Sequence, residues 1–152
     1  MERGVTARDR QAGSAKDHRE LRVYQLAFKC ALRVHGLSKK FRPEERYSLT
    51  DQIRRASRSV CTNIAEAWRK RRYPSYFGSK LSDDMEAGET RVWLESCQHF
   101  RYISQDEYAE LVGDYDHICG QLGRLMAQPE AWMPRTADIL RSTVHAPRST
   151  SQ

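Results

Sequence analysis

Residues 51–72 read DQIRRASRSVCTNIAEAWRKRR. On a helical wheel that advances about 100° per residue, the apolar side chains of this stretch gather within roughly 60° of one direction; they are Ile53, Ala56, Val60, Ile64, Ala67 and Trp68. Arg54, Arg55, Arg58 and Arg69 fall together elsewhere, between roughly 100° and 200° from Ile53. The pattern predicts an amphipathic helix over about residues 50 to 68, with its apolar stripe inside and its arginines outside.

The basic run that follows this helix is expected to lie at its C-terminus. Arg71 would fall on the apolar stripe if the helix continued, so we expect the helix to end or bend just before RKRR. The helix dipole favours cations at that end, and Tyr73 and Tyr76 adjoin them as possible stacking partners for bases. The candidate nucleic-acid-binding residues are therefore Arg54, Arg55, Arg58, Arg69, Lys70, Arg71 and Arg72.

Three interpretations of these cations stay open on charge alone. They could form an ordinary solvated face, or a docking strip for phosphates, which suits the planar fork of arginine. They could also meet the acidic sequence DDMEAGE of a neighbouring subunit, which makes Asp83, Asp84 and Glu86 candidate oligomer contacts.

Apolar residues at helical spacing predict three more helices. One covers about residues 21 to 40 before Pro43, and another begins near Pro74 and continues to about residue 101. The last opens with a capping box at Ser104 and Glu107 and continues to about Gln128. Its apolar residues form a heptad-like seam: Tyr108, Leu111, Tyr115, Ile118, Leu122 and Leu125.

Short connections between these helices predict an all-α fold, an antiparallel up-down-up-down four-helix bundle over residues 18–128. Residues 1–17 are polar and lack an apolar period, so we expect a disordered tail. Residues 129–152 are expected to be a mostly disordered tail, in which the apolar patch at 131–133 could dock or fray.

The charge of the chain is divided between its two parts. The net charge is +6 over 152 residues, but residues 1–72 contain 19 Lys and Arg against 8 Asp and Glu, whereas residues 73–152 contain 7 against 12. The basic part could meet nucleic acid, a membrane surface or the acidic part of another copy. Four cysteines placed singly, with no signal peptide or membrane span, lead us to expect a reduced, cytoplasmic protein with no membrane partner.

The sequence lacks the patterns of an enzyme or of a metal site. Asp114 and His117 have the Glu-x-x-His type of spacing found in di-iron bundles, yet both lie opposite the apolar seam of their helix. The first helix has no Asp or Glu between Glu20 and Phe41, so four helices cannot supply the inward carboxylates. We therefore expect no catalytic residues, no metal and no cofactor.

The motif QIRRA…S…NIAE resembles the signature of a bacterial four-helix-bundle family. The segments RPEERYSLT and ETRVWLESCQHFRYIS extend the resemblance over roughly residues 20–128, although Ala67 replaces the glycine that commonly follows NIAE. The family includes proteins encoded by intervening sequences of 23S rRNA genes. It also includes the accessory variability determinant of diversity-generating retroelements (Avd-like proteins).

This resemblance implies a homopentameric ring with a basic surface. The retroelement member is a non-catalytic partner of a reverse transcriptase and binds nucleic acid, so the resemblance implies RNA, DNA and a reverse transcriptase as partners. Gln52, Arg54 and Arg55 match the motif, as do Asn63 and Glu66. For Asn63 and Glu66 we expect a structural role: the amide fixes helix pairing, and the carboxylate pairs with Arg69 or with a neighbour's arginine.

Two hypotheses for function follow. The first is a non-catalytic, basic, nucleic-acid-binding accessory protein that binds mainly through phosphates. The alternative is a homo-oligomeric protein-interaction scaffold, in which the basic and acidic surfaces serve assembly and nucleic acid has no role.

Overall fold

Helices account for every regular element of residues 15–84 and 87–133, the parts of the chain that the computed structural model describes. This confirms the all-α prediction for those residues. The α-helices are α2 (Arg22–Ser38), α3 (Leu49–Arg69), α4 (Pro74–Asp83), α5 (Ala87–His99) and α6 (Gln105–Ala127). Short 3-10 turns lie at His18–Glu20 (η1), Pro43–Glu45 (η2) and Pro129–Trp132 (η4).

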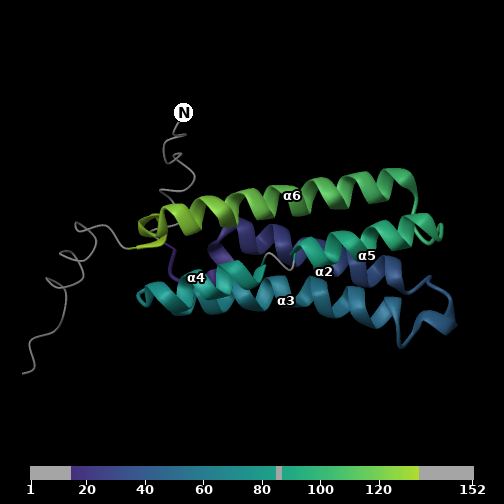
Figure 1. The fold of residues 1–152 in the computed structure, drawn as a ribbon, viewed down its shortest axis with the longest axis horizontal. Helices are drawn as coiled ribbons and strands as arrows, with labels where there is room; N and C mark the ends of the chain where they lie inside the picture. The colour runs from purple at the N-terminus through teal and green to yellow at the C-terminus, as the bar shows by residue number, and fades with distance from the viewer. Residues whose placement is uncertain (1–14, 85–86, 134–152) are drawn as a thin grey trace, which may run out of the picture.

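The long helices lie lengthwise beside one another, as Figure 1 shows. Helix α3 contacts α2, α4 and α5, and α6 contacts the same three helices. Helices α4 and α5 follow each other along one side of the molecule, so together they fill the place of the single helix predicted from Pro74 to about residue 101. The prediction of one uninterrupted helix was wrong, because α4 ends at Asp83. Aspartate and glycine are poor residues for a helix interior, and Asp83, Asp84 and Gly88 surround this point.

The apolar stripe of α3 faces the core as predicted. Ile53, Val60 and Ile64 are each at most 1% exposed. Helix α6 contributes its predicted seam, of which Leu111, Tyr115, Ile118, Leu122 and Leu125 are buried. The capping box is also confirmed, since the Glu107 amide donates to Ser104 Oγ at 3.1 Å and the Ser104 amide donates to Glu107 Oε1 at 2.9 Å.

The ordered core extends beyond the predicted end of the bundle at residue 128. Trp132, in η4, is 2% exposed. Its ring makes edge-on contacts with Trp68, at 5.6 Å between centroids, and with Phe77, at 5.5 Å. Of the apolar patch predicted to dock or fray, Trp132 therefore docks. Most of both predicted tails, residues 1–14 and 134–152, lies outside the described residues.

The four cysteines are free thiols, and three of them are buried. Burial raises the pKa of Cys30 and Cys97 to about 12 and that of Cys61 to about 11. These three thiols are therefore protonated at neutral pH and act as small apolar side chains of the core. None of the helices in the described part of the chain is long and apolar enough to cross a membrane.

Candidate nucleic-acid interface

The arginines of α3 lie on the side of the helix away from its buried stripe. Arg55 and Arg58 are exposed, whereas Arg54 is half-buried. The Arg55 Nε lies 3.1 Å from a carboxylate oxygen of Asp51, one turn earlier. Arg54 Nε donates to Ser38 Oγ of α2 at 2.7 Å. The predicted outward orientation is therefore confirmed for Arg55 and Arg58, while Arg54 bridges to α2.

Sequence reasoning did not select His35, which lies beside these arginines. Its Nδ1 is 3.3 Å from Arg58 Nη2. The charge of Arg54, followed by partial burial and by the charges of Lys39 and Arg58, lowers the pKa of His35. A surplus of positive charge therefore exists where α2 and α3 meet. The sequence did hold a sign of this cluster, because His35, Ser38 and Lys39 are polar residues close together at the end of α2.

Helix α3 ends one residue into the basic run RKRR, whereas it was predicted to end just before that run. Its last residue is Arg69, and Lys70 is the C-cap. Arg69 and Arg72 are exposed. The Lys70 ammonium lies 5.7 Å from the ring centroid of Tyr73 and 5.9 Å from that of Tyr76, so the predicted neighbourhood of cations and aromatic rings is present.

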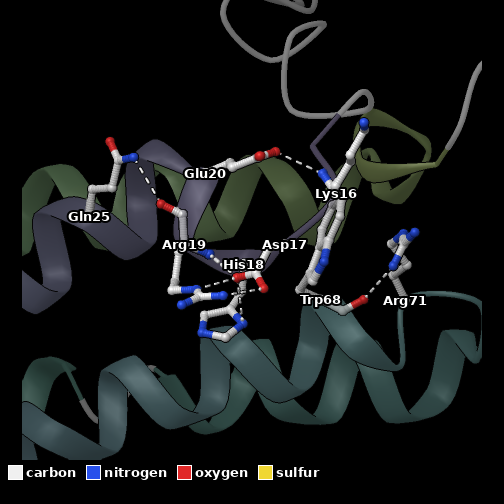
Figure 2. Close-up of polar contacts among 8 residues, drawn as sticks. All are labelled: Lys16, Asp17, His18, Arg19, Glu20, Gln25, Trp68 and Arg71. Atoms are coloured by element: carbon white, nitrogen blue, oxygen red, sulfur yellow. Dashed lines mark hydrogen bonds and ion pairs between the residues drawn. The ribbon is translucent and has the colours of Figure 1, made fainter.

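Arg71 differs from its neighbours because it packs on the core. Its guanidinium carbon lies 4.0 Å from the ring centroid of Trp68. Its Nη1 donates to the Trp68 carbonyl oxygen at 3.0 Å, a bond drawn in Figure 2. Burial, and then the charge of Arg72, lowers the pKa of Arg71. Arg71 is therefore part of the packing at the end of α3, with only part of its side chain available to a ligand.

The segment before η1 lies over the end of α3 (Figure 2). Together they enclose a surface hollow that is lined by Lys16, Asp17, His18, Ala65, Glu66, Trp68, Arg69 and Arg71. Arg19 donates two hydrogen bonds to the Asp17 carboxylate, from Nε to Oδ1 at 3.0 Å and from Nη2 to Oδ2 at 3.1 Å. These bonds lower the Asp17 pKa to about 2. Because residues 16 and 17 were assigned to a disordered tail, sequence reasoning missed their contribution to this surface.

The two residues expected to be structural lie on α3. Asn63 is half-buried. Glu66 accepts a hydrogen bond from the Tyr76 hydroxyl at 2.8 Å and lies 3.2 Å from Lys80 Nζ, both in α4. The hydrogen bond from Tyr76, and then Lys80, lowers the pKa of Glu66. Within the subunit this carboxylate therefore joins α3 to α4, in place of the expected ion pair with Arg69. A pairing with a neighbour's arginine stays a prediction.

The acidic candidates for oligomer contacts are not equivalent. Asp83 is exposed at the end of α4. Asp84 is 1% exposed, so its side chain belongs to the interior of the subunit and does not offer a surface to a neighbour. Glu86 lies outside the described residues. Within residues 15–84 and 87–133, no three His, Cys, Asp or Glu side chains are grouped as they would be to hold a metal ion.

Comparison with known proteins gave a match to a family model and matches to solved structures. Residues 19–124 match the family model of the 23S rRNA-intervening sequence proteins. The chain also resembles the crystal structure of a protein of unknown function from the S23 ribosomal protein family of Bacteroides thetaiotaomicron. That likeness has a TM-score of 0.63 and 28% sequence identity, and covers 70% of this chain and 96% of the other. A comparison with curated proteins gave no match.

Proposed function

The chain belongs to the 23S rRNA-intervening sequence protein family, and from this premise we propose that it is a non-catalytic accessory protein that binds the phosphate backbone of RNA or DNA. One observation supports this most. Of the seven candidate cations, Arg55 alone has a carboxylate of the described residues within ion-pair distance. The other six have none there. Guanidinium groups without carboxylate partners are available for phosphates, to which they bind in bidentate fashion.

The dimensions of α3 suit this role. Arg54 and Arg69 are separated by 15 residues of one helix, or about 22 Å at ~1.5 Å per residue. Successive phosphates of one strand are roughly 3.4 Å apart along a duplex axis, so the stripe is long enough to meet several of them. Tyr73, which is 64% exposed beside Lys70, adds a ring on which an unpaired base can stack.

An antiparallel up-down-up-down order of the helices is part of the proposal. Contacts between the helices support it, because residue numbers rise along one helix as they fall along its neighbour. His35 and Ser38 of α2 meet Arg58 and Arg54 of α3 respectively. Likewise, Cys30 of α2 meets Asp114 of α6, while Arg33 meets Glu110. The homopentameric ring and a reverse transcriptase as protein partner are proposed on the resemblance alone.

Low-salt binding tests the proposed function directly. We expect the wild-type protein to bind fluorescein-labelled single-stranded RNA and DNA with little sequence preference. The logarithm of the association constant should fall linearly with the logarithm of salt concentration, by about 0.7 to 0.9 per phosphate neutralised. Fluorescence anisotropy over a salt series measures this slope, and absence of binding to both probes at low salt would contradict the proposal.

A homo-oligomeric scaffold is the second candidate, and the exposed face of α2 favours it. Phe28 and Leu32 are 47% and 60% exposed, one turn apart. Tyr24 stacks on Phe28 at 5.9 Å between ring centroids, and these residues line a shallow hollow with Arg19, Gln25 and Lys29. Neighbouring exposed apolar side chains of this kind are typical of protein contacts.

Sedimentation separates the two functions. If this face supports assembly, the double variant Phe28→Asp and Leu32→Asp should sediment as a smaller species, because carboxylates in an apolar contact are desolvated without partners. Gln105→Asp, at an exposed polar position of α6 outside this hollow, is the control and should leave the oligomer intact. A scaffold without a nucleic-acid role would show this loss of assembly and no RNA binding in either protein.

A further inference from the structure

Several cationic groups converge where α2 and α3 meet, and a buried serine fixes one of them. Ser38 is 3% exposed. Its hydroxyl donates to the His35 carbonyl oxygen at 2.9 Å and accepts from Arg54 Nε at 2.7 Å. Arg54 is therefore held by one edge of its guanidinium. The Nη groups of Arg54 make no hydrogen bond or ion pair to another side chain in the described part of the chain.

The contact between Arg58 and His35 fixes the state of the imidazole. An arginine side chain in a protein carries only donors and stays protonated. A hydrogen bond across the 3.3 Å between Arg58 Nη2 and His35 Nδ1 therefore uses Nδ1 as an unprotonated acceptor. Among the described residues, no carboxylate lies within ion-pair distance of Arg54 or Arg58.

We propose that His35, Arg54 and Arg58 form a binding site for one phosphate group, and that His35 takes up a proton when the phosphate binds. This inference rests on the proposed function where the phosphate belongs to a nucleic-acid backbone; free inorganic phosphate is the other source of the same chemistry. On binding, the donors of Arg58 turn from His35 Nδ1 to a phosphate oxygen. A proton from solvent then occupies Nδ1, and the imidazolium becomes a third donor to the anion.

The groups that face His35 explain why the proton is coupled to the anion. They are Arg54 and Arg58 of α3 and Lys39 of α2, and all of them are cations that lower the pKa of the free imidazole. A bound phosphate offsets this repulsion and raises the pKa again. Between the free and bound pKa values, binding consumes up to one proton, so affinity rises as the pH falls, by at most about tenfold per pH unit.

The His35 titration in the intact wild-type protein is the direct test. Proton NMR of the imidazole ring is recorded against pH alone, with inorganic phosphate, and with single-stranded RNA. The site predicts a higher pKa of His35 with at least one of these two probes. A rise of the His35 pKa with RNA alone shows that the site takes a phosphate of the nucleic-acid backbone. A rise with both probes shows a general phosphate site. An unchanged His35 titration with both probes overturns the inference.

This design separates the inference from the proposed function. If RNA fails to bind at any pH but inorganic phosphate raises the pKa of His35, the proposed function falls and the phosphate site stands. If RNA binds with equal affinity at about pH 6 and about pH 8, on either side of the ordinary imidazole pKa, and inorganic phosphate leaves the His35 pKa unchanged, the proposed function stands and the His35 site is excluded.

Variants give a second readout by RNA anisotropy across the same pH range. His35→Gln should remove the pH dependence and weaken binding severalfold at the acidic end. His35→Lys carries a permanent charge and should bind equally at both pH values. His117→Gln, at an exposed position of α6, is the matched control and should keep the wild-type pH profile. A His35→Gln variant that retains the wild-type pH profile overturns the inference.

Discussion

Replacing Arg69, Lys70 and Arg72 together by alanine is expected to weaken RNA and DNA binding by roughly 10- to 100-fold at low salt. It should also lower the magnitude of the salt slope by about 2 to 3 units, because each phosphate contact contributes about 0.7 to 0.9. Arg69 and Arg72 are exposed at the end of α3, and Lys70 lies next to them beside two tyrosine rings. Loss of phosphate contacts should act on every sequence alike, which anisotropy with unrelated probes measures.

A matched variant removes the same charge from the other end of the helices. Lys40, Arg42 and Arg46 are exposed around the connection between α2 and α3, so their replacement by alanine changes the net charge equally. We expect this control to change the salt slope by less than about one unit. Equal losses in both triple variants would show that net charge, and not the end of α3, governs binding. Arg71 is kept in both proteins because its side chain packs on Trp68.

The replacement Trp132→Ala is expected to lower the free energy of unfolding by about 3 to 5 kcal/mol, the usual cost of removing a large aromatic side chain from a core. Trp132 is buried and contacts the rings of Trp68 and Phe77. Since neither ring can move into the vacated space without disturbing α3 or α4, a cavity should remain. Urea denaturation followed by circular dichroism measures the change.

Glu130→Ala is the control for this measurement. Glu130 is exposed in the same turn, and surface substitutions usually change stability by no more than about 0.5 kcal/mol. A cost below about 1 kcal/mol for Trp132→Ala would mean that η4 only rests on the surface and that the core ends with α6.

The fold could be predicted wherever an apolar period repeats over several turns. Helix α3 shows this most clearly, since Ile53, Val60 and Ile64 specify one face on their own. The division between α4 and α5 could not be predicted in this way, because the apolar residues continue at helical spacing across it. Trp132 was uncertain for a different reason: an isolated aromatic residue in a proline-rich stretch has no period, and its burial depends on rings supplied by α3 and α4.

The candidate interface was predictable in its charges but not in its contacts. The wheel placed Arg55 and Arg58 outside the core, and it placed the end of the helix within one residue of the observed end at Arg69. It could not indicate that Ser38 holds Arg54, or that His35 lies beside Arg58, because those contacts depend on the register between two helices. The same limit applies to Glu66, whose partners Tyr76 and Lys80 lie in the next helix along the chain.

The indole of Trp68 lies between two very different neighbours, with the Arg71 guanidinium over its face and the edge-on ring of Trp132 nearby. Indole emission depends on the electric field around the ring, so a phosphate that draws Arg71 away would shift the colour and intensity of the light that Trp68 emits. If phosphate binds at the end of α3 as proposed, a change in Trp68 emission, measured against that of Trp93 and Trp132, should report the binding without an attached dye.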